Sequence, residues 1–332
     1  MKKILFLAAI AVIQGTAVAM AQQIAVVSEG GSTDVYQTLQ EAIEGASNGS
    51  VIYLPGGGFQ ILDSVKITKR LSIIGIGHKA KNENVDGNTT IAGNLFFNEG
   101  ASGSSVMGCY LSGNVHIGED GNSVNNIIIK YCNLNSVQVK NNLCVGTIVN
   151  RNYIRSTSYL GGATVAISNN VMHSIREVGG GTIGNNIITS EYSYSNYLKC
   201  ALYNISNTTI AYNFVALTPH YGSGVSIERY IHSGNNCQIY GNMARGDWGD
   251  DCINIGNTDW KEIFVNPNSI NSTYDYHFTE DYQQYSDCGI YGGTGFSDGA
   301  LPPVPFIVAK SIPEQTDAAG NLNIKIRVKA GE

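Results

Sequence analysis

The stretch "AISNNVM" at residues 166–172 returns in altered form as "TIGNNIIT" (182–189), "TIAYNFVA" (209–216) and "QIYGNMA" (238–244). In each copy an isoleucine lies three residues before an asparagine, and an apolar residue follows that asparagine. The pattern extends back along the chain, with asparagines at intervals of 16 to 20 residues and then of 27 and 29. They are Asn94, Asn114, Asn133, Asn152, Asn170, Asn186, Asn213 and Asn242. A short recurring period of this kind is the signature of a solenoid.

Each repeat unit favours β-strands. Apolar residues alternate within it, as they do in a strand with one buried face. We interpret the asparagines as one structural ladder at a corner of the coil. Each would adopt a left-handed backbone conformation and bond to nearby backbone or to the asparagine of the next coil. The sequence therefore predicts an all-β fold, a single-stranded right-handed parallel β-helix of about nine or ten coils.

The two ends of the chain predict different elements. Residues 33–47 fit an amphipathic capping helix with Thr33 or Asp34 as its N-cap. Such a helix would cover the open end of a β-helix domain that spans residues 22–300. After the proline-rich linker "LPPVP" (301–305), "FIVAKSI" and "LNIKIRV" flank "TDAAGN". Residues 301–332 therefore predict a linker and a terminal strand hairpin, or strand cap, at the other end of the stack.

The first 21 residues read as a secretory signal peptide. Lys2 and Lys3 precede an apolar stretch over residues 4–13, and Ala19-Met20-Ala21 is a small-x-small cleavage site. We expect a mature chain that is secreted, periplasmic or bound at the cell surface. No later segment has the length and hydropathy of a transmembrane helix.

Charge and cysteine content narrow the functional classes. The chain has 20 basic and 26 acidic residues and no run of lysine or arginine, which argues against a nucleic-acid partner. Its seven cysteines contain no C-x-x-C pair, and its six histidines no H-x-H or H-E-x-x-H motif, which argues against a zinc site. We interpret most of the cysteines as buried free thiols.

Two segments carry a family resemblance. "YQTLQEAIEGASNGSVIYLPGG" (36–57) is similar to the opening coil of secreted right-handed β-helix proteins of the pectate-lyase-like superfamily. "EIFVNPNSINSTYDYHFTEDYQQYSDCGIYGG" (262–293) resembles the closing coil of β-helix proteins exported by Bacteroidetes. The resemblance covers nearly the whole mature chain at the level of fold. That superfamily includes polysaccharide lyases, glycoside hydrolases, esterases and non-catalytic surface proteins, so the resemblance implies an architecture rather than an activity.

The two longest repeat intervals suggest where a ligand would bind. They contain the extra segments 190–207 and 218–236, and insertions in a solenoid emerge as loops, often on the binding face. Together with residues 245–256 they are rich in side chains that suit sugar rings and acidic substituents. The predicted substrate-binding residues are Tyr192, Tyr194, Tyr197, Tyr221, Tyr230, Glu228 and Trp248. The alternative interpretation is that these loops only shield the core.

The motif "GDDCINI" (249–255) resembles one of the polygalacturonase family, which implies acid and base roles for Asp250 and Asp251. The family's G-H-G and R-I-K motifs are missing here, and "NTD" (257–259) follows the aspartates instead of preceding them by a coil. These departures leave a hydrolase in doubt. An aspartate-rich turn is the structural alternative.

A second hypothesis is that the protein is a polysaccharide lyase. Asp247, Asp250 and Asp251 offer the oxygen ligands that calcium prefers, and a cation would acidify the C5 proton of a uronate. Lys199, His220, Arg229 and Arg245 are the candidate bases. We therefore expect a monomeric protein that engages an acidic polysaccharide or cell-surface glycan. Among enzymes a lyase is favoured slightly over a hydrolase. A non-catalytic glycan-binding protein or adhesin, or a surface structural protein, is the rival hypothesis.

Overall fold

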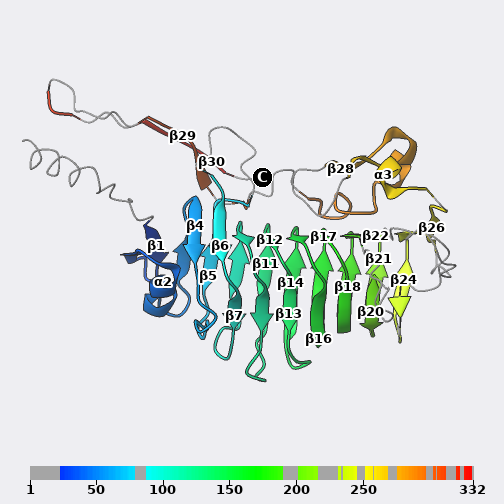
Figure 1. The fold of residues 1–332 in the computed structure, drawn as a ribbon, viewed down its shortest axis with the longest axis horizontal. Coiled ribbons are helices and arrows are strands. Elements are labelled where there is room, and N and C mark those ends of the chain that lie inside the picture. Colours follow the sequence, from blue (N-terminus) through cyan, green and yellow to red (C-terminus); the bar gives the residue numbers. More distant parts are fainter. Residues whose placement is uncertain are drawn as a thin grey trace, which may run out of the picture.

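The computed structural model describes residues 23–78, 87–189, 201–215, 231–232, 235–244, 251–256, 258–267, 275–296, 302–303, 305–311, 319–321 and 325–330. Most strands in these residues pair in parallel with the strands one coil before and one coil after them. The chain makes three strands in each coil, so equivalent strands stack into three faces (Figure 1). The fold is all-β with long parallel sheets, as in a β-solenoid, which agrees with the prediction from the repeat.

Face 1 holds the strands that begin each coil. They are β3 (Val51–Tyr53), β5 (Ser72–Ile74), β8 (Ser105–Met107), β11 (Ile128–Lys130), β14 (Val145–Asn150), the later parts of β16 (Ser158–Ser168) and β18 (Ile175–Gly184), β21 (Thr208–Ala211) and β24 (Gln238–Tyr240). Residues Ile167, Ile183, Ile210 and Ile239 pair in register along it. The isoleucines that lie three residues before the repeated asparagines therefore stack in one file.

Face 2 follows face 1 in each coil and forms a separate sheet. Its strands are β4 (Gly57–Gln60), β6 (Thr89–Ala92), β9 (Tyr110–Leu111), β12 (Asn133–Leu134), β15 (Tyr153–Ile154), β17 (Val171–Met172), β19 (Ile187–Ile188), β22 (Phe214–Val215), β25 (Met243–Ala244) and β26 (Ile253–Asn254). Face 3 closes the coil. It consists of β7 (Leu95–Phe97), β10 (Val115–Ile117), β13 (Val137–Val139), the first residues of β16 and β18, β20 (Leu202–Ile205) and β23 (Ile231–His232).

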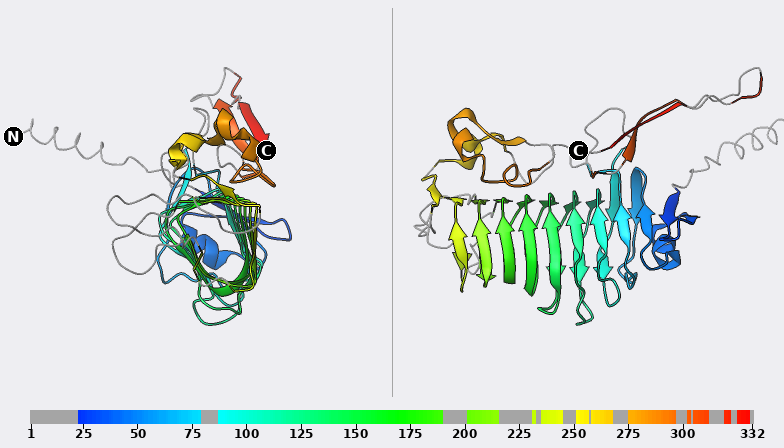
Figure 2. Two further views of the ribbon diagram at one scale, coloured as in Figure 1. Left: turned by 90° about the vertical axis from the view of Figure 1, so that its right-hand side faces the viewer. Right: turned by 180° about the vertical axis from the view of Figure 1, so that it is seen from behind.

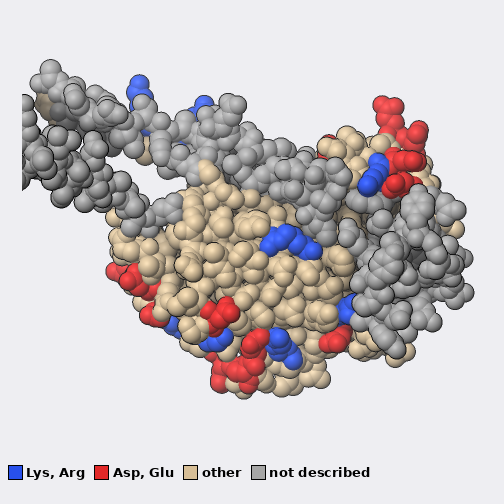
Figure 3. Space-filling model, viewed as in Figure 1, with Lys and Arg blue, Asp and Glu red and all other residues tan. Residues whose placement is uncertain are grey.

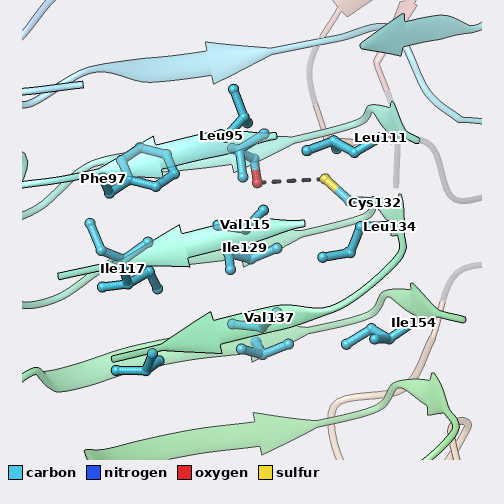
Figure 4. Close-up of a cluster of buried hydrophobic side chains, with 14 of the residues drawn as sticks. Leu95, Phe97, Leu111, Val115, Ile117, Ile129, Cys132, Leu134, Val137 and Ile154 are labelled. Carbon is cyan, nitrogen blue, oxygen red and sulfur yellow. Dashed lines mark hydrogen bonds between the residues drawn. The ribbon is translucent and has the colours of Figure 1, made fainter. Parts of the chain in front are cut away.

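The core runs along the inside of the stack. Successive side chains of a strand point to opposite sides, so each strand sends every second residue inward. In one coil Ile129 of face 1, Leu134 of face 2 and Val137 of face 3 are all fully buried and belong to the same apolar cluster (Figure 4). Like residues from neighbouring coils continue this cluster in both directions.

The first elements of the described chain differ from the prediction. β1 (Ile24–Val27) pairs antiparallel with both β2 (Thr33–Tyr36) and β3. The helix α2 covers only Leu39–Gly45, and its N-cap is Thr38, which forms a capping box with Glu41. The predicted helix over 33–47 with Thr33 or Asp34 as its cap is thus wrong at its start, because pairing with β1 holds those residues in a strand. Of the apolar side chains predicted on one side of the helix, Leu39, Ala42, Ile43 and Ala46 are buried in the core, whereas Val35 lies in β2 and is exposed.

The eight asparagines do not form one ladder. Asn152, Asn170, Asn186, Asn213 and Asn242 do stack at the corner between faces 1 and 2, where each side-chain oxygen accepts the backbone N–H of the preceding ladder residue. Cys109 and Cys132 occupy this corner in earlier coils, and the Cys132 N–H donates to Asn152.

The other three asparagines lie elsewhere. Asn94 and Asn114 stack at the corner before face 3, where the backbone N–H of Asn114 donates to the Asn94 side chain. Asn133 lies within β12, in register with Tyr153.

The left-handed conformation also belongs to a different residue than predicted. It is the residue before the ladder position that has positive φ, as at Arg151 (58°), Asn169 (54°) and Asn185 (55°). The ladder asparagine itself turns its amide into the corner. For example, Nδ2 of Asn186 donates to the carbonyl of Ile167 in the preceding coil and to Oδ1 of Asn213 in the following coil. One side chain therefore links its own coil to both neighbours.

After face 2 ends, the chain folds back along the outside of the stack. We call residues 258–296 the strap. It contains α3 (Trp260–Ile263), β27 (Phe264–Asn266), β28 (Asp275–Phe278), which pairs antiparallel with β27, and the 3₁₀ helix η1 (Glu280–Tyr285). Viewed down the stack, the coils superimpose in one outline and the strap lies outside it (Figure 2).

The strap covers the outer side of face 2. A second apolar cluster joins the two: Tyr153, Val171, Ile187, Phe214 and Met243 from face 2, and Ile263, Phe264, Tyr276, Phe278, Cys288, Ile290 and Phe296 from the strap. The strap passes the coils in reverse order. Gly289 donates to the carbonyl of Tyr212, Asn169 donates to the carbonyls of Ile290 and Gly292, and Arg151 donates to the carbonyl of Gly295.

The last two strands form a hairpin, which does not lie at the far end of the stack. β29 (Pro305–Ser311) and β30 (Lys325–Ala330) pair antiparallel. Just before them, buried Pro302 lies so close to Gly108 that a Cβ there would be 2.7 Å from the proline ring. The hairpin therefore lies beside the early strands β4 and β6 (Figure 1) and not across the last coil, because the strap has carried the chain back.

All cysteines of the described residues are free thiols, and Cys109, Cys132, Cys144 and Cys288 are buried. This agrees with the expectation of buried thiols that behave as small apolar side chains.

Candidate functional site

Almost all of the predicted site lies outside the described residues. This holds for the candidate bases Lys199, His220, Arg229 and Arg245, for Asp247 and Asp250, and for Tyr192, Tyr194, Tyr197, Tyr221, Tyr230, Glu228 and Trp248. Asp251 is described: it is exposed and has a φ of 51°, so it is a turn residue just before β26. Aspartate tolerates this conformation, as the structural alternative for "GDDCINI" requires. The roles of the other residues in binding and catalysis stay predictions.

In sequence, the two predicted insertions, 190–207 and 218–236, run into strands of face 3. β20 begins at Leu202, within the first insertion, and β23 begins at Ile231, within the second. β20 and β23 are the last two strands of face 3. The outer side of face 3 is therefore the part of the described structure nearest in sequence to the predicted binding loops.

Outward-pointing side chains of face 3 form a continuous row with one residue per coil. Strand pairing sets them in direct register, each beside the next. We call this the face 3 row: Phe96, His116, Gln138, Tyr159, Arg176 and Tyr203. The backbone of His232 continues the register beyond Tyr203. With about 4.8 Å between neighbouring strands, the six residues span about 24 Å along the stack.

Five of the six members, all except Gln138, contact a neighbour in the row through a π system. The rings of Phe96 and His116 are stacked with centroids 4.6 Å apart. The guanidinium carbon of Arg176 lies 5.4 Å from the ring centre of Tyr159 and 5.8 Å from that of Tyr203, within the range of cation–π attraction. Lys66 covers the Phe96 ring with its ammonium group 3.3 Å from the centroid. The row is thus a platform of rings and cations.

A charged cluster adjoins the row at His116. Its Nδ1 is 2.8 Å from Glu119 Oε1, and Lys140 Nζ is 3.2 Å from the same oxygen. Burial lowers the pKa of His116, and the carboxylate of Glu119 offsets only part of that effect. For Glu119, burial acts to raise the pKa, but the hydrogen bond from Lys140 and the adjacent positive charges bring the pKa below its ordinary value. At neutral pH the cluster holds a neutral imidazole, a carboxylate and an ammonium group.

The other two faces offer less to a ligand. The outer side of face 2 from Tyr153 onward is covered by the strap. Face 1 presents mainly small side chains in the corresponding register, such as Ala166, Thr182 and Thr209. Tyr159, in contrast, is 38% exposed on face 3. On the side shown in Figure 3, basic and acidic side chains of the described residues are sparse and interspersed.

Sequence reasoning predicted the kinds of side chain in a glycan site but not these residues. It pointed to tyrosines and cations on the insertions, whereas Tyr159 and Arg176 come from regular strands outside them. Tyr203 lies within the predicted insertion 190–207, but in the strand β20. Each row residue stands between two inward residues, as in "LFF" (95–97), "VHI" (115–117) and "VQV" (137–139). That alternation is the signal in the sequence that could have identified the row.

No protein-family model, no curated protein and no solved structure matches the chain. Within the described ranges, no helix has the length and apolar character needed to cross a bilayer. Among the same residues, no three His, Cys, Asp or Glu side chains come together to hold a metal ion. The predicted calcium site, with Asp247 and Asp250 outside these ranges, stays a prediction.

Proposed function

We propose that this protein is exported, that it is a right-handed parallel β-helix of the pectate-lyase-like type with α2 closing its first coil, and that it binds an extended acidic polysaccharide along face 3. The observation that carries the proposal is the face 3 row. Its residues repeat at one strand spacing, and a glycan repeats at the length of a sugar ring. A regular polymer of sugars can therefore make the same kind of contact on successive coils.

The chemistry of the row supports a sugar ligand. Tyrosine combines a flat apolar ring, which suits the apolar face of a pyranose, with a hydroxyl that hydrogen-bonds to sugar hydroxyls. Arg176 and Lys66 add positive charge, which favours uronates or sulfated sugars over neutral glycans. Strand register sets the row over about 24 Å, a length that favours a polymer over a small molecule.

Tyr159→Ala tests this function, with Tyr240→Ala as its matched control. Tyr240 is exposed to 37%, close to the 38% of Tyr159, but it lies on face 1. We expect Tyr159→Ala to weaken binding to a polysaccharide ligand about tenfold, as expected for loss of a central aromatic contact, and Tyr240→Ala to leave it unchanged. Binding would be measured by affinity electrophoresis in gels that contain polygalacturonate, alginate or dextran sulfate. Equal effects of the two substitutions would exclude face 3 as the binding surface.

The cluster at His116 favours a second function, that of a uronate lyase. His116 Nδ1 lies 2.8 Å from Glu119 Oε1 but makes no hydrogen bond to the described residues. In the proposed mechanism Nε2 of the neutral imidazole acts as the base. The C5 proton of a uronate would move to Nε2, and the electrons of that C–H bond would form the double bond to C4. The bond from C4 to the glycosidic oxygen breaks, and this oxygen takes a proton from water. Lys140 and Lys66 supply positive charge close to His116.

Ultraviolet absorbance of the unsaturated uronate product tests the lyase function. We expect polygalacturonate or alginate to give this product with the unmodified protein and His116→Gln to abolish its formation. His277→Gln is the control, because His277 also lies beside a carboxylate, with Nδ1 2.6 Å from Asp275 Oδ1, but belongs to the strap. Product formation that survives His116→Gln would reject this mechanism while leaving the binding function intact.

A further inference from the structure

Arg176 is the most unusual member of the face 3 row. No acidic side chain of the described residues pairs with its guanidinium group, in contrast to Arg70, which pairs with Glu29. Its Nε is buried and has no hydrogen-bond partner within the part of the chain that the structure describes. A buried charged donor without an acceptor is costly, so the positive charge of this side chain lacks compensation among the described residues. Its terminal nitrogens, unlike Nε, are not among the buried unpartnered atoms, so a bound acceptor would reach the guanidinium group there.

The neighbours of Arg176 fix how such an acceptor can approach. In-register Tyr159 and Tyr203 lie on either side of the guanidinium group, one coil before it and one coil after it. Both rings are within cation–π distance and occupy the two directions along the stack. The N–H donors of a guanidinium lie in its plane, so an oxyanion would bind at its outer edge, between the two tyrosines.

We propose that Arg176 recognises an anionic substituent of the glycan, a carboxylate or a sulfate, by hydrogen bonds in the plane of its guanidinium group. The inference depends on the proposed binding of a glycan along face 3, and it names the position that distinguishes acidic from neutral sugars. The flanking tyrosines would contact the sugar that carries the anion and the next one along the chain. Arginine suits this task better than lysine, because its planar donors match the two oxygens of such a group.

The test compares Arg176→Gln and Arg176→Lys with Arg70→Gln, which removes the same charge at an exposed position outside the row. Four polymers serve as probes: polygalacturonate, its carboxyl-reduced counterpart, dextran sulfate and unmodified dextran. Affinity would be measured by isothermal titration at one salt concentration. A charge-assisted hydrogen bond contributes enough that we expect Arg176→Gln to weaken binding of an anionic polymer about ten- to a hundredfold. We expect its effect on a neutral polymer to be less than about twofold.

The outcomes separate this inference from the proposed function. Loss of binding to polygalacturonate alone identifies a carboxylate, and loss of binding to dextran sulfate alone identifies a sulfate. If Arg176→Lys weakens binding less than Arg176→Gln does, the positive charge contributes to recognition, and the loss that remains with lysine is the contribution of the planar guanidinium donors. If Tyr159→Ala weakens binding and Arg176→Gln does not, or if Arg70→Gln has the same effect as Arg176→Gln, the inference is overturned while the glycan function stands. If the unmodified protein binds none of the four polymers, both are overturned.

Discussion

Replacing Asn186 by alanine should destabilise the stack far more than the same change at Asn94. Asn186 is completely buried, and five hydrogen bonds involve its side chain. Its Oδ1 accepts from the backbone N–H and from Nδ2 of Asn170, both at 3.0 Å. Its Nδ2 donates to the carbonyls of Ile167 and Gly184, both at 3.0 Å, and to Asn213 Oδ1 at 2.9 Å. Three acceptors share the two Nδ2 protons, so at about 1 kcal/mol for each bond the loss amounts to about 4–5 kcal/mol.

Asn94→Ala is the matched control, because it removes an asparagine of the same repeat from the other corner. Its two bonds, with the Asn114 N–H and with Asp63, lie at a partly exposed position where water can replace the side chain. We expect a cost of about 1 kcal/mol or less.

Urea unfolding followed by circular dichroism would measure both losses of stability. Amide hydrogen exchange adds a local readout, because the N–H of Asn170 should exchange faster in Asn186→Ala than in the unmodified protein. If Asn186→Ala lost no more stability than Asn94→Ala, the buried ladder would not be the main stabilising feature of this corner, and the reasoning would be refuted.

Three further predictions follow from packing and charge. Phe214→Ala removes a fully buried ring between face 2 and the strap and should lower the free energy of unfolding by about 3–5 kcal/mol. In limited proteolysis the strap of this variant should be cut before the coils. Cleavage within the coils first would contradict this prediction. The folded-state pKa values of His116 and Glu119 are lowered, so their contribution to stability is complete at a pH above the unfolded-state pKa values. The contribution of His116 is lost as pH falls below about 6.5, and that of Glu119 as pH falls below about 4.3. His116→Gln should therefore flatten the upper part of a plot of stability against pH, and an unchanged profile would contradict the lowered pKa of His116. Burial raises the pKa of the Cys132 and Cys288 thiols to about 12, so both should resist iodoacetamide until the protein is unfolded, which mass spectrometry would detect.

The repeat in the sequence predicted the coils but not their phase. A period of about 20 residues measures the length of one coil, whichever corner the repeated residue occupies. Asn94 and Asn114 therefore show the same spacing as Asn152 and Asn170, although the two pairs lie at different corners. Only the strand register, fixed by hydrogen bonds between coils, separates them.

The strap and the row escaped prediction for related reasons. Val171 and Met172 are adjacent apolar residues, and alternation allows only one of them to face the core. Met172 does so, and Val171 instead packs beneath the strap, which a single strand cannot reveal. The face 3 row could not be recognised from a single strand either. In the sequence, His116 and Tyr159 look like ordinary outward-pointing residues, and only the register between strands shows that both belong to the row.

The path of the strap also affects how the protein unfolds. Arg151, Asn169, Asn185 and Tyr212 belong to four successive coils, and all four are bonded to residues 287–295. An open-ended array can lose its units one at a time from a free terminus. Here the strap is bonded to four successive coils, so we expect these coils to unfold together. The strap also fixes the number of coils between residues 151 and 212, because with one coil more or fewer its length would no longer match the distance that it spans.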